Sequence, residues 1–121
     1  MKPSILQTKS LEFAVRIVKF YRFLTQEKNE FVMSKQILRC GTSIGANCHE
    51  STNAQSEADF LSKLNIALKE ADETHYWLQL LQRSDYITAS EFDSLQQDLK
   101  ELIAMLTSSI KTIKEKIKNK K

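Results

Sequence analysis

The chain is poor in the residues that make tight turns, because its 121 residues include only two glycines and one proline. Hairpins between strands depend on glycine, proline and asparagine-glycine pairs, so a sheet with many such connections is not expected. The scarcity favours a few long helices joined by short links. The length suits one domain, which we assign to residues 1–121, with a basic tail at the end.

Long hydrophobic runs and cysteine pairs are also missing. No stretch approaches the roughly 18 uninterrupted apolar residues of a membrane span, and the N-terminus lacks the apolar core of a signal peptide. Cys40 and Cys48 are about 12 Å apart along one helix, which is too far for a disulfide and unlike the spacing of metal ligands. We therefore expect a cytoplasmic protein, not bound to a membrane, with reduced and buried cysteines.

Charge is nearly balanced overall, at +3, but it is unevenly distributed. Residues 1–39 carry +5, residues 40–106 carry −7 and residues 107–121 carry +5. Blocks of opposite sign in so small a protein predict complementary charged faces, either between subunits or toward a polyanion.

Apolar residues spaced by three and four predict helices over about residues 8–28, 31–51, 56–84 and from 88 onward. Ser56 with Asp59, and Thr88 with Glu91, are typical of the caps that begin helices. Leucines and isoleucines of the last segment repeat like the seam of a bundle. Because the links are short, successive helices must run antiparallel. The predicted fold is an all-α, elongated, up-down-up-down four-helix bundle.

The first predicted helix has more apolar surface than one buried face needs. We assign one stripe of it to the core, namely Leu11, Ala14, Val15, Val18, Tyr21 and Leu24. Phe13 and Phe20 lie outside that stripe, and we interpret them as part of a homo-oligomer interface. Trp77 of the third helix also lies off the core stripe. It could stack a nucleobase, but its acidic surroundings favour packing against a neighbouring subunit.

Both glycines, Gly41 and Gly45, lie in one segment whose apolar residues keep helical spacing. Each glycine costs a helix interior about 1 kcal/mol relative to alanine, so something that a side chain would exclude must compensate. The two glycines predict a second helix pressed against the bare backbone. We therefore interpret residues 36–51 as the packing centre of the bundle.

A polar face runs beside the glycines, formed by Arg39, Ser43, Asn47 and Glu50. A ligand-binding or catalytic site is one interpretation of this face. We favour a structural network, in which Arg39 binds a carboxylate of the third helix, either Glu70 or Glu73, because a guanidinium removed from water needs an acceptor.

Motifs for catalysis, metal or phosphate binding are not found. His75 follows Asp72 by three residues, as in the E-x-x-H of di-iron bundles, but that chemistry needs a second such motif and two further inward carboxylates. No serine, threonine or cysteine has an evident activating base. We expect no enzyme activity, no metal and no cofactor.

Basic residues are the one feature that points to nucleic acid. The start of the first helix and the end of the last lie at one end of an antiparallel bundle, which predicts a basic surface there. Its residues are Lys2, Lys9, Arg16, Lys19, Lys111, Lys114, Lys118, Lys120 and Lys121. We predict weak RNA or DNA binding with little sequence preference, because no arginine-rich or aromatic patch is present. The alternatives are a solvated lysine tail, and an adaptor that holds a partner enzyme through the acidic surface of the third and fourth helices.

Several runs of residues resemble one bacterial family over nearly the whole chain. They are S-I-G-A-N at 43–47 with Glu50, A-x-S-x-x-D-F at 54–60, K-L-x-I-A-L-K-E-A-x-E-T-x-Y-W-L at 63–78 and D-Y-I-T-x-x-E-F at 85–92. Together they resemble the four helix bundle proteins, also called 23S rRNA-intervening-sequence proteins. In place of the S-I-P-x-N form of many relatives, this chain has S-I-G-A-N.

The resemblance implies an up-down-up-down bundle that assembles into a ring, commonly a homopentamer. Some members are encoded inside intervening sequences of large-subunit rRNA genes. In a related branch, the accessory proteins of diversity-generating retroelements, the bundle pairs with a reverse transcriptase and binds nucleic acid through a basic surface. The structural signature that we assign comprises Arg39, Gly41, Ser43, Gly45, Asn47, Glu50, Glu70 and Glu73.

Overall fold

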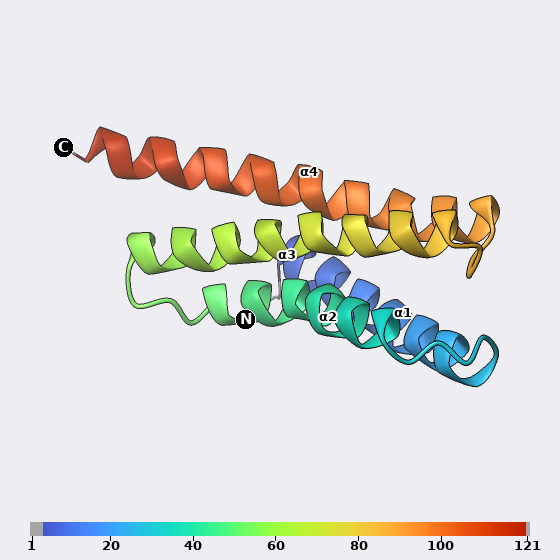
Figure 1. The fold of residues 1–121 in the computed structure, drawn as a ribbon. Helices are drawn as coiled ribbons and strands as arrows, with labels where there is room; N and C mark the ends of the chain where they lie inside the picture. The colour runs from blue at the N-terminus through green and yellow to red at the C-terminus, as the bar shows by residue number, and fades with distance from the viewer. Residues whose placement is uncertain (1–3, 121) are drawn as a thin grey trace.

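The computed structural model describes residues 4–120, which form four α-helices and no strand. The helices are α1 (Ile5–Gln26), α2 (Met33–Ser51), α3 (Glu57–Arg83) and α4 (Ala89–Asn119). They pack as an up-down-up-down bundle, which confirms the predicted fold (Figure 1). The bundle is elongated, because α3 and α4 have 27 and 31 residues whereas α1 and α2 have 22 and 19.

The predicted caps of α3 and α4 are confirmed. The Ser56 hydroxyl accepts a hydrogen bond from the backbone amide of Asp59, at 3.1 Å. Thr88 and Glu91 form a complete capping box, in which each side chain accepts a hydrogen bond from the other residue's amide, at 3.1 and 2.8 Å. Helix α1 begins three residues earlier than predicted, because the Ser4 hydroxyl caps it.

Two connections turn without glycine. Asn29, between α1 and α2, has a φ of 52°, and Asp85, between α3 and α4, has a φ of 66°. Asparagine and aspartate are the residues that, after glycine, most readily adopt this left-handed conformation. The two positions therefore explain how a chain with so little glycine reverses direction.

Glu30 caps α2, a role that the sequence pattern did not indicate. Its carboxylate accepts hydrogen bonds from the amides of Val32, Met33 and Ser34, at 3.1, 3.1 and 2.7 Å, and the residue is only 6% exposed. Burial raises the pKa of Glu30, but the hydrogen bonds from the three backbone amides together lower it by more. The pKa of Glu30 therefore lies below its ordinary value. The cap places the start of α2 at Met33, two residues later than predicted.

The face of α1 that enters the core differs from the predicted one. The buried residues are Ser10, Phe13, Ile17, Phe20 and Leu24, whereas Leu11 and Val15 of the predicted stripe are 65% and 48% exposed. The bulkier aromatic and isoleucine stripe buries more apolar area, and Gly41 of α2 leaves room for Ile17. The interpretation of Phe13 and Phe20 as interface residues is therefore wrong, because both are core residues of one chain, 2% and 8% exposed.

The core face of α4 agrees closely with the predicted seam. The leucines and isoleucines that form this seam are buried, namely Leu95, Leu99, Leu102, Leu106, Ile110 and Ile113. Phe92 and Ile117, at the ends of the seam, are partly buried. Ile87, in the turn between α3 and α4, is 5% exposed and closes that end of the bundle. The sequence pattern did not indicate that Gln96 is buried. Its side chain forms a 2.7 Å hydrogen bond with His75.

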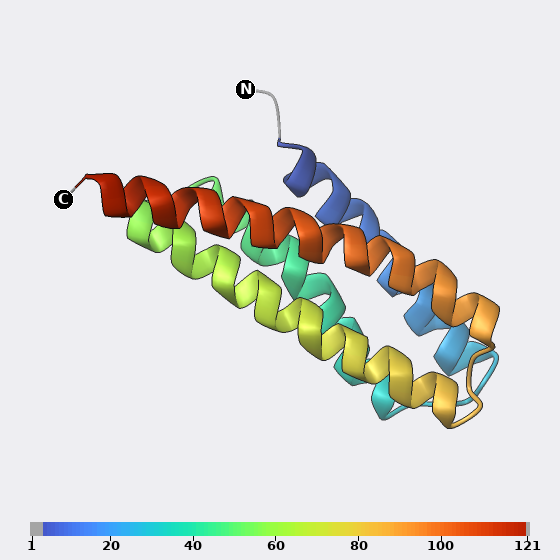
Figure 2. The ribbon, with the colours of Figure 1, turned by 90° about the horizontal axis from the view of Figure 1, so that it is seen from above.

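The bundle is closed at one end and open at the other. Each helix packs along the next one in the chain, but α1 and α4 touch at few points. They approach each other near the α3–α4 turn and diverge toward the N-terminus of α1 (Figure 2). The last turns of α4 therefore have no stretch of α1 opposite them.

The Glu30 cap predicts a pH-dependent stability. Its carboxylate stabilises the fold when ionised, and because the folded pKa is lowered, this contribution is complete above the unfolded pKa and is lost as the pH falls through the folded one. We expect Glu30→Gln to reduce the free energy of unfolding at pH 7 by about 1 kcal/mol, the usual value of an N-cap. In urea denaturation, this difference should shrink toward pH 3.

Glu27→Gln is the control, since Glu27 is exposed and makes no side-chain hydrogen bond or ion pair with the described residues. A difference between wild type and Glu30→Gln that stays constant down to pH 3 would contradict the assigned role of the carboxylate.

Candidate functional site

Arg39 on α2 binds two carboxylates of α3, as predicted. Its guanidinium donates hydrogen bonds to Glu73 and, at 3.3 Å, to Glu70. Desolvation lowers the pKa of Arg39, but the charges of Glu73 and Glu70 raise it above its ordinary value, so the guanidinium stays charged. The Arg39 side chain is 50% exposed, so the ion pairs orient α2 on α3 more than they stabilise it.

Trp77 extends this network along α3. Its indole N–H donates to Glu73 at 3.1 Å, and its ring meets that of Tyr76 edge to face, with centroids 5.1 Å apart. Trp77 is partly buried against the core, whereas Tyr76 is 55% exposed. A carboxylate beside the indole makes this a poor platform for a nucleobase, so the subunit contact of Trp77 stays the preferred prediction.

The other members of the polar face do not converge with Arg39. The Ser43 hydroxyl donates to the Arg39 carbonyl at 2.6 Å, and the Asn47 amide donates to the Ser43 carbonyl at 2.9 Å. Glu50 forms a 3.7 Å ion pair with Lys63 of α3. Each group is thus paired along α2 or across to α3, an arrangement that fits helix packing better than ligand binding.

The two glycines of α2 lie where α1 crosses it. A Cβ atom at Gly45 would be 3.0 Å from the backbone oxygen of Ser10, and one at Gly41 would be 2.9 Å from a side-chain carbon of Ile17. This confirms the prediction of a second helix pressed against the bare backbone. Gly45 is the more constrained position, because its neighbour is backbone and cannot rotate away.

Both cysteines are buried and free, as expected for small hydrophobic residues. Burial raises the pKa of each thiol, which keeps Cys40 and Cys48 in the unreactive protonated form. Among residues 4–120, no group of three or more His, Cys, Asp or Glu side chains is placed to hold a metal ion.

The predicted basic end is not formed as one surface. Lys9 pairs with Glu101 at 2.7 Å and Arg16 pairs with Asp98 at 2.6 Å, so both lie against α4 well before its last turns. The divergence of α1 from α4 separates them from the α4 lysines. Sequence spacing could not indicate these pairs, because the partners come from helices far apart in the chain.

The unpaired lysines of the predicted basic surface therefore lie mainly on one helix, α4. Lys120 pairs with Glu57 of α3 at 2.7 Å, whereas Lys111, Lys114 and Lys118 are exposed and have no ion pair with any described residue. Lys19 is likewise exposed and unpaired within residues 4–120, but it lies near the closed end beside Phe20 and Phe23. The predicted positions Lys2 and Lys121 lie outside the described residues.

In residues 4–120, no helix has the length and hydrophobicity needed to cross a bilayer. The architecture defines a class, the all-helical antiparallel four-helix bundles. A family model described as 23S rRNA-intervening sequence protein matches residues 3–108. The chain belongs to this family.

A solved structure from Bacteroides thetaiotaomicron is similar over nearly the whole chain. It is described as a protein with unknown function from the S23 ribosomal protein family, and it shares 60% sequence identity at a TM-score of 0.89. The similarity covers 92% of this chain and 99% of that one. No curated protein matches the chain.

The close approach at Gly45 makes a testable prediction. Leucine favours a helix over glycine by about 0.8 kcal/mol. A loss of stability in Gly45→Leu would therefore have to come from packing against α1. We expect the free energy of unfolding to fall by about 2 kcal/mol, because the backbone of α1 must move away. Urea denaturation followed by circular dichroism measures the change.

Lys35→Leu is the matched control, because Lys35 is an exposed α2 residue that makes no side-chain hydrogen bond or ion pair with the described residues. A Gly45→Leu protein as stable as this control would remove the argument that α2 is the packing centre.

Proposed function

We propose that the protein is a non-enzymatic cytoplasmic scaffold that assembles with copies of itself. The observation that carries the proposal is the exposed apolar face of α1, where Leu11 is 65% exposed and Val15 48% exposed. Ala14 and Val18 continue the same face and are partly buried. A helix that presents apolar residues to water on one side needs a partner there.

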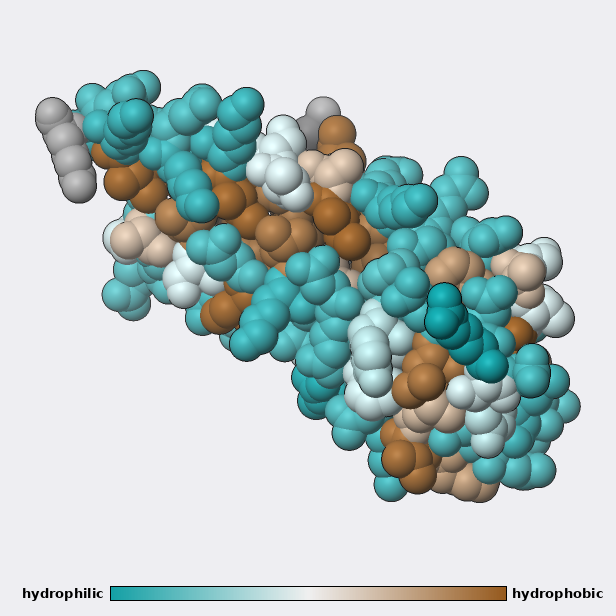
Figure 3. Space-filling model, turned by 45° about the horizontal axis from the view of Figure 1, so that its top comes forward, coloured by the Kyte–Doolittle hydropathy of each residue, from teal (hydrophilic) through white to brown (hydrophobic). Residues whose placement is uncertain are grey.

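The neighbouring surface of α2 suits such a contact. A shallow groove of about 280 Å³ between α1 and α2 is lined by Leu11, Ala14, Thr42, Gly45 and Ala46, with Gln7 and His49 at its polar edge. Small residues on α2 allow another helix to approach closely. Apolar surface also forms a band along the molecule between α4 and α3 (Figure 3).

A second candidate patch for self-assembly, made of aromatic and arginine side chains, lies on the α2–α3 side of the bundle. Tyr76, Trp77 and Arg39 belong to the residue types most enriched in protein interfaces, and they occupy the α2–α3 side of the bundle. When a patch on one subunit binds a different patch on the next, the contacts form a ring if the rotation between subunits closes, and an open filament if it does not. Two distinct patches are therefore consistent with the ring that the family resemblance implies.

Replacing the two exposed residues of this apolar face together, Leu11→Glu with Val15→Glu, should test the assembly. We expect the wild-type protein to have a solution mass that is a multiple of 14.0 kDa, and the double variant to run at 14.0 kDa with unchanged helical content. Light scattering after size exclusion measures both masses. Introducing two charges into an apolar interface should weaken association by several kcal/mol.

Val32→Glu provides the matched control, because Val32 is 73% exposed at the α1–α2 turn, away from this face. A monomeric wild type, or equal dissociation of the control, would overturn the proposal.

We also propose polyanion binding as a second function, favoured by the stripe of free lysines on α4. Lys111, Lys114 and Lys118 are spaced by three and four residues, so they share one side of the helix. Hydrophilic side chains follow this outer side of α4, above the apolar band (Figure 3). With no aromatic residue between the lysines, contacts to phosphates without base readout are expected.

The adaptor alternative receives less support from the structure. Three acids of α3, Glu57, Glu70 and Glu73, are already paired with Lys120, Lys116 and Arg39 inside the chain. Their charge is therefore less available to a protein partner than the sequence suggests.

Replacing Lys111, Lys114 and Lys118 together by glutamine should weaken binding to a single-stranded 20-nucleotide RNA at all salt concentrations. For each lysine that no longer neutralises a phosphate, the slope of log K against log salt should become shallower by about 0.7. Fluorescence anisotropy at several salt concentrations measures this slope. A triple glutamine variant at Lys28, Lys35 and Lys69, which are exposed and have no ion pair with the described residues, removes the same charge elsewhere. An equal weakening in this control would show that net charge alone drives binding.

A further inference from the structure

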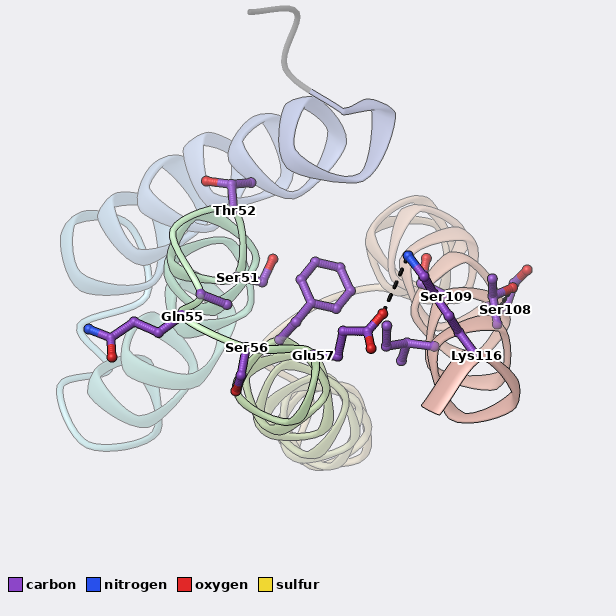
Figure 4. A pocket seen from close by; sticks show the side chains of 12 residues that line it. Ser51, Thr52, Gln55, Ser56, Glu57, Ser108, Ser109 and Lys116 are labelled. Atoms are coloured by element: carbon purple, nitrogen blue, oxygen red, sulfur yellow. Dashed lines mark hydrogen bonds and ion pairs between the residues drawn. The ribbon is translucent and has the colours of Figure 1, made fainter. Parts of the chain in front are cut away.

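A groove lies at the open end of the bundle, where α1 has diverged from α4. Its volume is about 710 Å³, within the range of small-molecule sites. Figure 4 shows Ser51 and Thr52 at the end of α2 on one side and Ser108, Ser109 and Lys116 of α4 on the other. The α2–α3 connection and the first turn of α3 form the remaining wall.

The register of the helices creates this groove. Lys9 pairs with Glu101 and Arg16 with Asp98, so α1 follows only the first half of α4. From Ser108 onward, α4 faces the end of α2 and the start of α3 without α1 between them. Two sides of the groove are therefore formed by helices whose positions are set by the core, and the α2–α3 connection closes the third.

The lining combines an apolar interior with hydroxyl groups. Phe60 and Ile113 supply the large apolar side chains, and Ala54 adds a small one. Around them lie the hydroxyls of Ser51, Thr52, Ser56, Ser108, Ser109 and Thr112. Thr112 donates to its own helix, at the carbonyl of Ser108, whereas Ser109 is partly buried and makes no side-chain hydrogen bond with the described residues. The interior suits an apolar group that carries few polar atoms.

Charge at the rim is positive. Glu57 binds Lys120 at 2.7 Å and Lys116 at 3.3 Å, so one carboxylate holds two ammonium groups. The hydrogen bonds from Lys120 and Lys116 lower the pKa of Glu57, and together they outweigh burial, which raises it. The Glu57 carboxylate therefore stays ionised. If Lys116 turned to another anion, Glu57 would keep Lys120 as its partner. The Lys116 side chain is 63% exposed and points across the groove to Glu57 (Figure 4).

We propose that this groove binds an amphipathic anion, whose apolar chain lies on Phe60 and Ile113 and whose carboxylate is held by Lys116. Ser109 and Lys116 are separated by two helical turns, about 10 Å, which matches the length of a medium-chain carboxylate. A neutral amphiphile lacks the head group for Lys116, and a cation would meet two lysines against one carboxylate. The site is independent of the proposed self-assembly, since one chain supplies every group.

Decanoate is the probe, and isothermal titration calorimetry of the full chain is the measurement. Ser109→Phe should fill the groove and weaken decanoate binding by about tenfold or more, because the apolar chain loses its place. Lys116→Met keeps the apolar stem but removes the charge, so it should weaken decanoate about tenfold while leaving the neutral probe decanol unchanged.

Lys114→Met is the matched control, because Lys114 lies on the outer side of α4 and does not line the groove. If Ser109→Phe lowers the midpoint of thermal unfolding, Thr112→Phe is used in its place. Thr112 also lines the groove, and it is exposed. Absence of saturable decanoate binding in the wild type would overturn the proposal. So would equal weakening in Lys114→Met and Lys116→Met, or undiminished binding when the groove is filled.

Discussion

The backbone contact between α1 and α2 at Gly45 determines how the rest of the bundle is arranged. Since a Cβ atom at Gly45 would be 3.0 Å from the Ser10 oxygen, the two helices cross as closely as their backbones allow. Gly41, one turn earlier, leaves room for the side chain of Ile17. These contacts fix the rotation of α1 about its own axis, so the stripe containing Phe13 and Ile17 must face inward.

That rotation has consequences on both sides of α1. On the outer side it leaves Leu11 and Val15 in water, which is the main reason to infer a partner subunit. On the other side α1 diverges from α4 toward its N-terminus, which leaves the last turns of α4 without α1 opposite them and opens the end of the bundle. A candidate interface and a candidate ligand groove thus follow from the same close approach, although they share no residue.

Features set by neighbours in the sequence could be predicted, and features set by several helices at once could not. The caps at Ser56 and Thr88, the seam of α4 and the glycine crossing each follow from local spacing. Helix α1 carries two apolar stripes of similar period, and the choice between them depends on space that α2 provides. The partner of Arg39 could be predicted because few carboxylates of α3 lie within its reach, whereas the register of α1 against α4 had no local signal.

Ion pairing within the chain also changes how its charge should be understood. The sequence contains blocks of +5, −7 and +5, which suggested faces that attract other molecules. In the structure the negative block supplies partners for both positive ones, since Glu101 and Asp98 bind α1 while Glu57 binds the end of α4. Many of the charged side chains therefore form ion pairs within the chain, between α1 and α4 and between α3 and α4. The proposed association with other copies therefore rests on burial of the α1 apolar face, and the proposed polyanion binding rests on the lysines of α4 that these pairs leave free.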